Sequence, residues 1–279
     1  MWGLIMKNIK IGACDWGLPG AGLYAMKIAA EFGIEALSLR IGLFENNYPL
    51  AEPVIQKYYL EDQQRYGIDI CAIALNDYDN LPMHARKGTR HYDLVWTILH
   101  KAVATAKALG VKVVQVPAFG ESEMKTQADM EQSALCFQYL CDKLGPLGIQ
   151  VASESLLRPE EFARLHQLVD RPNFGAYYDS QNYHLFRGYD QLEILQGLYP
   201  YMVNQLHVKD GSGAMSGGLL GSGDSNFLGS MKMLTDKGFE GYILTENYYD
   251  QLPLRLEADD PYDLLREDLK VLRETVQSL

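Results

Sequence analysis

The sequence of 279 residues predicts a (β/α)8 TIM barrel formed by one domain, residues 1–279. Eight short apolar runs alternate with longer stretches of helical periodicity, and strands joined by crossover helices must be parallel. Eight units of about 35 residues each match the size of a strand, a helix and their loops. An open doubly wound sheet is the alternative, but no GxGxxG or GxxxxGK[ST] motif follows any predicted strand.

The strands are predicted from apolar runs of strand length, such as IKIGAC and VKVVQV. In chain order they cover 9–14, 36–41, 68–75, 111–116, a run opening at 149–152, 174–178, 203–208 and 242–245. Helical periodicity covers 21–32, 50–66, 92–109, 127–144, 159–168, 227–234 and 261–276. A glycine suited to a left-handed helix end precedes five of the strands: Gly33, Gly67, Gly110, Gly148 and Gly238.

The composition excludes several classes of protein. Hydrophobic residues make up 47% and charged residues 22%, which is typical of a globular domain. No apolar stretch of about 20 residues predicts a transmembrane helix, and residues 1–10 lack the pattern of a signal peptide. The formal net charge of -11 disfavours binding to nucleic acid and to anionic membranes.

The cysteines indicate a reducing compartment, so we expect a cytoplasmic protein. None belongs to a CxxC pair, and we expect buried free thiols at all four positions: Cys14, Cys71, Cys136 and Cys141.

Polar residues end the last four predicted strands: Glu154, Asp179, His207 and Glu246. In a barrel of this kind the carboxyl ends of the strands meet at one rim, where active sites lie. Three carboxylates and an imidazole would be unstable together without a cation. Oxygen-rich ligands with one nitrogen suit Mn²⁺ or Mg²⁺, with Co²⁺ or Zn²⁺ as alternatives. Taken singly, each residue could instead be a helix cap or a structural side chain.

Other residues near the predicted rim are candidates for binding a substrate. Trp16 could form an apolar wall for a substrate ring, and Phe119 could line the pocket. Asn182 is a candidate partner for a substrate hydroxyl. Lys209 and Asp210 either support His207 and the metal or pair with neighbours.

Several further residues have less specific expectations. The glycine-rich segment 211–223 either cradles a phosphate with its backbone N–H groups or forms a mobile lid. We interpret Glu45 and Asp77 as solvated loop charges. The remaining histidines are interpreted as structural or surface residues: His84, His91, His100, His166 and His184.

At these positions the sequence resembles the sugar phosphate isomerase/epimerase superfamily, the xylose isomerase-like TIM barrels, which includes ketose 3-epimerases and hydroxypyruvate isomerase. The resemblance is carried by Glu154 and Glu246 and by the segments YDSQN (178–182), HVKDG (207–211) and LGSGDSNF (220–227). It implies a metal held by Glu154, Asp179, His207 and Glu246, with the two glutamates acting as acid and base.

The resemblance also defines where this chain departs from the ketose 3-epimerases. Their motif E-x-x-N-R-x-E is matched by Arg158 and Glu160, which the resemblance implies as substrate-binding residues, whereas Leu157 replaces the asparagine. Asn182 stands where those enzymes carry a histidine, and Gly213 where they carry an arginine. Endonuclease IV-type members need several extra histidines at the strand ends, which this chain lacks.

These observations together predict a divalent-metal-dependent isomerase or epimerase of a sugar or sugar-like keto compound. It would transfer a proton next to a carbonyl through an enediolate that the metal stabilises. A lyase or dehydratase that uses the same site is the alternative, and a non-enzymatic binding protein is a third reading. We expect a small carbohydrate as the partner, with a homodimer or homotetramer left open.

Overall fold

The computed structural model describes residues 8–278. The segment 1–7, which holds most of the stretch in which we expect no signal peptide, lies outside the described residues. Within the described part of the chain, no helix has the length and apolar character needed to cross a membrane.

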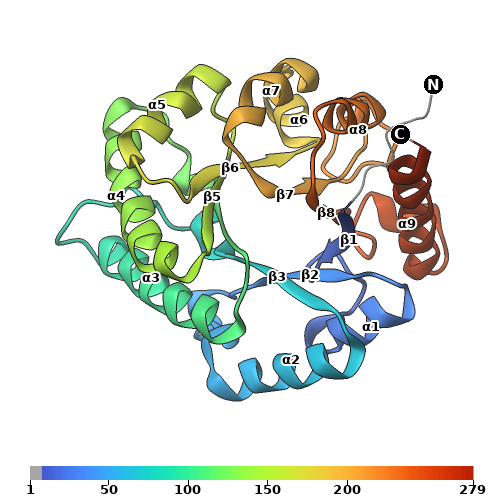
Figure 1. The fold of residues 1–279 in the computed structure, drawn as a ribbon, viewed down its shortest axis with the longest axis horizontal. Coiled ribbons are helices and arrows are strands. Elements are labelled where there is room, and N and C mark those ends of the chain that lie inside the picture. Colours follow the sequence, from blue (N-terminus) through green and yellow to red (C-terminus); the bar gives the residue numbers. More distant parts are fainter. Residues whose placement is uncertain (1–7, 279) are drawn as a thin grey trace.

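Eight parallel strands form one closed barrel in chain order, surrounded by helices (Figure 1). The barrel closes where β1 pairs with β8, with Ile9 opposite Gly241 and Ala13 opposite Thr245. This arrangement confirms the predicted (β/α)8 TIM barrel. The strands are β1 (Ile9–Cys14), β2 (Ala36–Arg40), β3 (Asp69–Ala74), β4 (Val113–Ala118), β5 (Gln150–Ser155), β6 (Phe174–Asp179), β7 (Met202–Val208) and β8 (Gly241–Thr245).

The helices that follow the strands agree with the predicted ones to within a few residues, except between β6 and β7. There the chain forms two short helices that the periodicity did not predict. Asp190 caps the second of them through the N–H groups of Leu192 and Glu193. The helices are α1 (Ala25–Glu31), α2 (Pro53–Tyr66), α3 (Arg90–Leu109), α4 (Gln127–Leu144), α5 (Pro159–Val169), α6 (Asn182–Arg187), α7 (Gln191–Leu198), α8 (Phe227–Asp236) and α9 (Pro261–Ser278).

The five predicted turn glycines lie where the helices end and the chain returns to the barrel. Gly67 and Gly110, for example, follow α2 and α3 with φ of 70° and 65°, in the left-handed region that a residue with a Cβ rarely adopts. The other three also have positive φ, which confirms the prediction.

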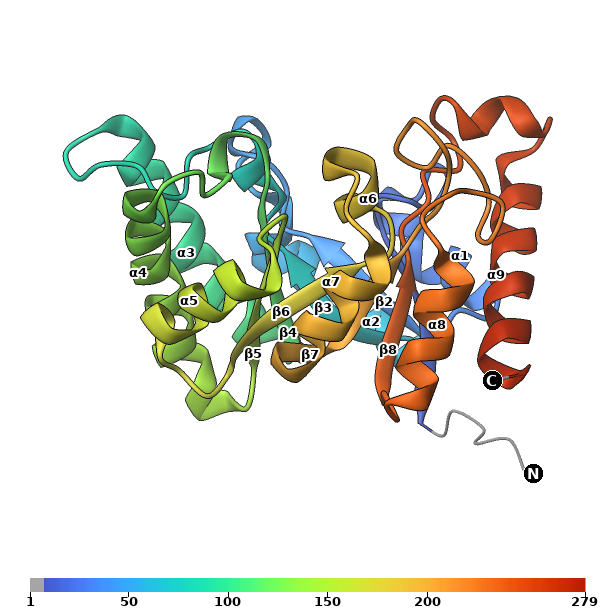
Figure 2. The same cartoon turned by 90° about the horizontal axis from the view of Figure 1, so that it is seen from above.

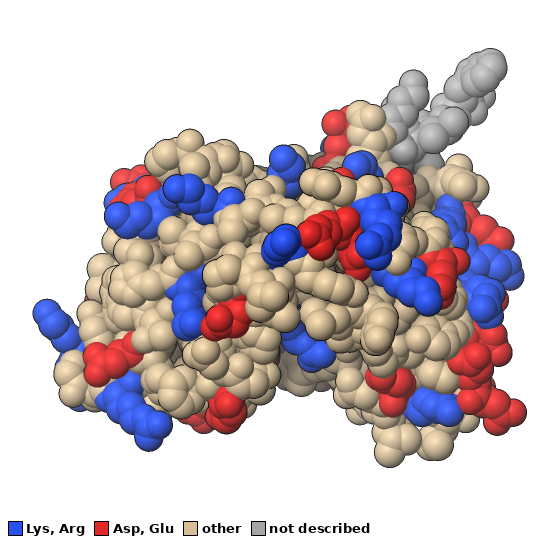
Figure 3. All heavy atoms as spheres, turned by 90° about the horizontal axis from the view of Figure 1, so that it is seen from below, with Lys and Arg blue, Asp and Glu red and all other residues tan. Residues whose placement is uncertain are grey.

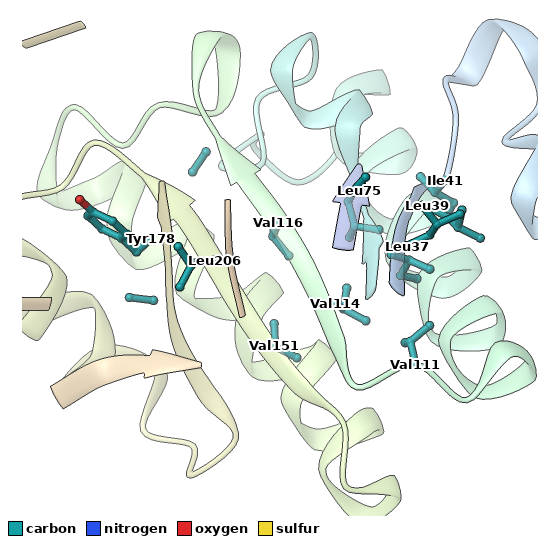
Figure 4. Close-up of a cluster of buried hydrophobic side chains, with 14 of the residues drawn as sticks. Leu37, Leu39, Ile41, Leu75, Val111, Val114, Val116, Val151, Tyr178 and Leu206 are labelled. Carbon is teal, nitrogen blue, oxygen red and sulfur yellow. The ribbon is translucent and has the colours of Figure 1, made fainter. Parts of the chain in front are cut away.

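The apolar core consists of two clusters. The larger one lies between the strands and the surrounding helices and includes Leu37, Val114 and Leu206 (Figure 4). The smaller one contains Ala152 and Tyr177. Along β5 and β6 these residues alternate with members of the larger cluster, so their side chains point into the barrel. This interior cluster forms an apolar floor beneath the carboxyl ends of the strands. All four cysteines are buried and free, as predicted.

The surface charges are mixed on the face that Figure 3 shows, where acidic and basic side chains are interspersed. One predicted surface charge was wrong. Asp77 is buried, and its carboxylate accepts hydrogen bonds from the Tyr48 hydroxyl at 2.7 Å and the Phe44 backbone N–H at 3.2 Å. Glu45 is exposed, as expected.

Candidate active site

The four predicted ligands come together at the carboxyl end of the barrel. Glu154 lies in β5, Asp179 ends β6, His207 lies in β7, and Glu246 follows β8 directly. All four are buried, and one ligand atom from each lies within 4.8 Å of the others. The barrel places them there because neighbouring parallel strands end at the same rim and every second residue points inward.

The imidazole of His207 is oriented toward the two glutamates. Its Nδ1 lies 3.3 Å from Glu246 Oε2 and 3.7 Å from Glu154 Oε2, and no hydrogen bond to Nδ1 occurs among the described residues. Its Nε2 lies 3.2 Å from the Cys14 sulfur, and Tyr177 packs edge-on against the ring. A buried ring nitrogen without a partner, facing carboxylates, is suited to a metal ion.

Neutral donors hold the two glutamates in place. Glu154 accepts hydrogen bonds from the side-chain amides of Gln115 and Asn182, the latter at 2.9 Å. Glu246 Oε1 accepts a hydrogen bond from Trp16 Nε1 at 2.9 Å. Each carboxylate therefore keeps lone pairs for a cation or for a proton, while its rotamer is fixed by its neighbours.

Asp179 is held from two sides. Its Oδ1 accepts the backbone N–H groups of Gln181 at 2.9 Å and Asn182 at 2.7 Å, where α6 begins. Its Oδ2 lies 3.0 Å from the Nζ of Lys209, which also contacts Glu246. Lys209 thus lies among the four residues and pairs with two of them, and its role stays a prediction.

The electrostatic environment shifts the pKa values of Asp179 and Glu246 in opposite directions. Burial raises the pKa of Asp179 to about 6, because the opposing charge of Lys209 compensates only in part. Burial also acts on Glu246, but the neighbouring His207 and Lys209 outweigh it and lower the pKa of this carboxyl. Burial acts to lower the pKa of Lys209, yet the surrounding carboxylates raise it above its usual range. The lysine is therefore charged beside the ligands.

The four donors fit a divalent ion. Three carboxylates and one imidazole match the oxygen-rich sets that hold Mn²⁺ or Mg²⁺, and the single nitrogen also suits Co²⁺ or Zn²⁺. In this cluster the ion would be held by Glu154, Asp179, His207 and Glu246.

A cavity of about 390 Å³ opens above the cluster and reaches Glu154, Glu246 and Lys209. The predicted substrate contacts Trp16, Phe119 and Asn182 all line it. The lining also includes Gln115, Arg40 and Asp79. The cavity is thus polar at its base and partly aromatic on its walls.

The other two predicted substrate contacts lie elsewhere. Arg158 and Glu160 are exposed and pair with each other, with 3.3 Å between Nε and Oε1. They are not among the residues that line the described cavity. Their role in binding substrate stays a prediction. The five histidines other than His207 also lie outside the cavity lining.

The glycine-rich segment after β7 is organised around Asp210 rather than around an open anion site. The Asp210 carboxylate accepts the backbone N–H groups of Gly221 at 2.9 Å and Gly223 at 3.2 Å, and also the Ser225 hydroxyl at 2.5 Å. A Cβ at Gly223 would collide with Asp210 Oδ1. The N–H groups of Gly221 and Gly223 are therefore occupied and do not form a phosphate cradle. Figure 2 shows this segment beside α6 at the end of the barrel away from the N-terminus.

Two contributors to the site were not predicted from the sequence. Gln115 lies in the apolar run of β4, where a polar residue at an inward position could have indicated a role in the site. Cys14 was interpreted only as a buried thiol, and nothing in its spacing indicates its contact with His207.

Proteins of known name or structure are similar to this chain along most of its length. A 2-epi-5-epi-valiolone 7-phosphate 2-epimerase of Actinoplanes sp. is 24% identical over 253 residues, which cover 90% of this chain and 92% of that protein. The crystal structure of a 3-keto-D-glucoside 4-epimerase from E. coli matches with a TM-score of 0.73 and 16% identity, over 95% of this chain and 99% of that one. The IOLI protein with a bound zinc atom matches with a TM-score of 0.73 and 18% identity, over 96% of this chain and 98% of that one.

The Actinoplanes epimerase supports an enzyme, and the structural matches show the same fold. A family model described as xylose isomerase-like TIM barrel matches residues 26–275. Since this match covers most of the chain, the protein belongs to the xylose isomerase-like TIM barrel family.

Proposed function

We propose that the protein is a divalent-metal-dependent isomerase or epimerase of a small keto sugar or sugar-like keto compound. The observation that carries the proposal is the buried cluster of Glu154, Asp179, His207 and Glu246, in which His207 Nδ1 has no hydrogen-bond partner among the described residues. Mn²⁺ or Mg²⁺ is the proposed ion, with Co²⁺ or Zn²⁺ as alternatives.

The two glutamates are the proposed proton carriers. A bound divalent ion supplies a Lewis acid that acidifies a C–H next to a substrate carbonyl. Glu246 and Glu154 both line the cavity. One oxygen of Glu246 and both oxygens of Glu154 accept hydrogen bonds from neutral donors. One would remove the proton and the other would return a proton to the neighbouring carbon or to the opposite face.

The donors around the cavity favour a substrate rich in hydroxyl groups. The amide oxygens of Gln115 and Asn182 are buried and have no hydrogen-bond partner within residues 8–278, although both residues line the cavity. Since their amide N–H groups hold Glu154, these oxygens are available to accept hydrogen bonds from substrate hydroxyls. Trp16 and Phe119 provide the apolar walls against which a sugar or cyclitol ring would lie.

The names of two similar proteins support an epimerisation. One is named for an epimerisation of a valiolone phosphate and the other for an epimerisation of a 3-keto-glucoside. Both names describe an epimerisation. We propose the same class of reaction here, on a substrate for which Asn182, Trp16 and Phe119 provide contacts.

The experiment that tests the proposal combines metal analysis with proton exchange. The purified protein, loaded with Mn²⁺, is incubated in D₂O with a panel of keto sugars and keto cyclitols, with and without phosphate. We expect one deuterium at the carbon beside the carbonyl of the recovered substrate or its epimer, detected by NMR. Loss of water would indicate the lyase alternative. Absence of stoichiometric divalent ion and of any exchange would overturn the proposal.

A further inference from the structure

Lys209 has a role in the cluster that the proposed chemistry does not require. Its side chain is 2% exposed, and its Nζ lies 3.0 Å from Asp179 Oδ2 and in contact with Glu246 Oε2. Two of the proposed metal ligands therefore share a fixed positive charge. We propose that Lys209 is a built-in counter-cation of the metal centre, which stabilises the metal-free barrel and weakens the binding of divalent ions. This inference rests on the proposed function.

The charges of the cluster support this role. Glu154, Asp179 and Glu246 bring three negative charges into a buried site, and such charges are unfavourable unless they are paired. Adding the unit charge of Lys209 to those of the three carboxylates reduces the net negative charge of the cluster from -3 to about -2. A divalent ion then neutralises the set, provided that His207 binds as neutral imidazole. Without the lysine, the same ion would leave one negative charge.

The backbone holds Lys209 in this place. Its N–H donates to the Ser180 hydroxyl at 3.0 Å, and the same hydroxyl donates to the Lys209 carbonyl at 2.7 Å. Ser180 directly follows Asp179, so the lysine and one of its carboxylate partners are tied to each other through the chain. The charge therefore stays close to the site when an ion binds, and the lysine and the ion repel each other.

The charge of Lys209 should have opposite effects on the metal-free and the metal-bound protein, and this difference can be tested. In the metal-free protein the lysine relieves repulsion between carboxylates, whereas in the metal-bound protein it stands beside a second cation. Removing its charge should destabilise the first form more than the second. A lysine that only packs or pairs structurally would affect both forms alike.

We would compare the full-length wild type with Lys209→Met and Lys209→Gln, and use Lys232→Met as the control. Lys232 is exposed and forms an i,i+4 pair with Asp236. Free Mn²⁺ is measured by electron paramagnetic resonance at fixed pH, and thermal unfolding is followed in EDTA and in saturating Mn²⁺. We expect both Lys209 variants to bind Mn²⁺ about tenfold more tightly or better, which corresponds to about 1.4 kcal/mol. Their Tm should fall in EDTA by more than in Mn²⁺.

Unchanged or weaker Mn²⁺ affinity in the Lys209 variants would overturn the inference, as would equal losses of Tm in the two conditions. A methionine variant that folds only in Mn²⁺ would support it. If Lys209→Met does not fold in either condition, the affinity of Lys209→Gln decides by the same criterion. Failure of the wild type and of every variant to bind Mn²⁺ would instead overturn the proposed function, and the inference with it.

Discussion

Glu246→Gln tests the proposed proton transfer most directly. The substitution keeps the shape of the side chain and removes one negative charge next to His207 and Lys209. In the wild type Oε1 accepts from Trp16 Nε1, whereas Oε2 faces the lysine. An amide has only one oxygen, so its NH₂ group must face one of these two donors.

The structure sets the size of the expected effects. A mispaired buried donor costs about 1–3 kcal/mol of stability, so the variant should still fold, with a lower Tm. Loss of a positioned acid or base should slow proton transfer by about 10²- to 10⁴-fold, equivalent to about 2.7–5.5 kcal/mol at the transition state. Loss of a negatively charged ligand should also weaken Mn²⁺ binding.

The assay measures deuterium incorporation at saturating Mn²⁺, so that weaker metal binding does not obscure slower proton transfer. Glu240→Gln is the matched control, because Glu240 is exposed and directly precedes β8, whereas Glu246 directly follows it. The control should exchange at the wild-type rate. A Glu246→Gln protein with near-normal exchange at saturating Mn²⁺ would refute the role assigned to this carboxylate.

Three further predictions concern the surroundings of the ligands. Cys14→Val should weaken Mn²⁺ binding by about 10- to 100-fold, because His207 Nε2 loses its partner. Cys14→Ser should keep an affinity near that of the wild type in the same titration. Equal Mn²⁺ affinities of the two variants would contradict this prediction. Mn²⁺ affinity should fall as the pH falls through about 6, since a proton on Asp179 then competes with the ion, and a titration that is flat from pH 5 to 7 would exclude such competition. Asp210→Ala should lower the free energy of unfolding in urea by about 3 kcal/mol or more, because buried hydrogen bonds are lost. Asp224→Ala, at an exposed position of the same loop, should change the free energy of unfolding little. An Asp210→Ala protein as stable as the wild type would show that the carboxylate does not organise the loop.

The sequence was sufficient for the barrel and for the ligand cluster because both depend on simple periodicity. Strand-length apolar runs recur with helices between them, and the proposed ligands are the polar residues that end four of these runs. In a parallel barrel, residues at such positions have little freedom in where they lie. Glu154 and Asp179 could therefore be placed together without knowledge of any side-chain rotamer.

Features that depend on the path of loops and long side chains were not accessible in the same way. Asp77 looked like a loop charge, but the fold of the neighbouring loop brings Tyr48 onto its carboxylate. The short helices α6 and α7 span too few residues for a clear helical period. The Nζ of Lys209 lies at the end of a flexible four-carbon stem, so its contact with Asp179 depends on packing that no sequence pattern encodes.

The contacts of the two glutamates suggest how the work is divided between them. Glu246 contacts the positively charged Lys209, whose charge favours the ionised form of this carboxylate. Glu154 is held mainly by the neutral amides of Gln115 and Asn182, which donate to a carboxylate without adding a full positive charge. A carboxylate beside a fixed positive charge stays in the ionised form that can accept a proton, whereas the amide donors of Glu154 add no net charge. We therefore expect Glu246 to remove the substrate proton and Glu154 to return it.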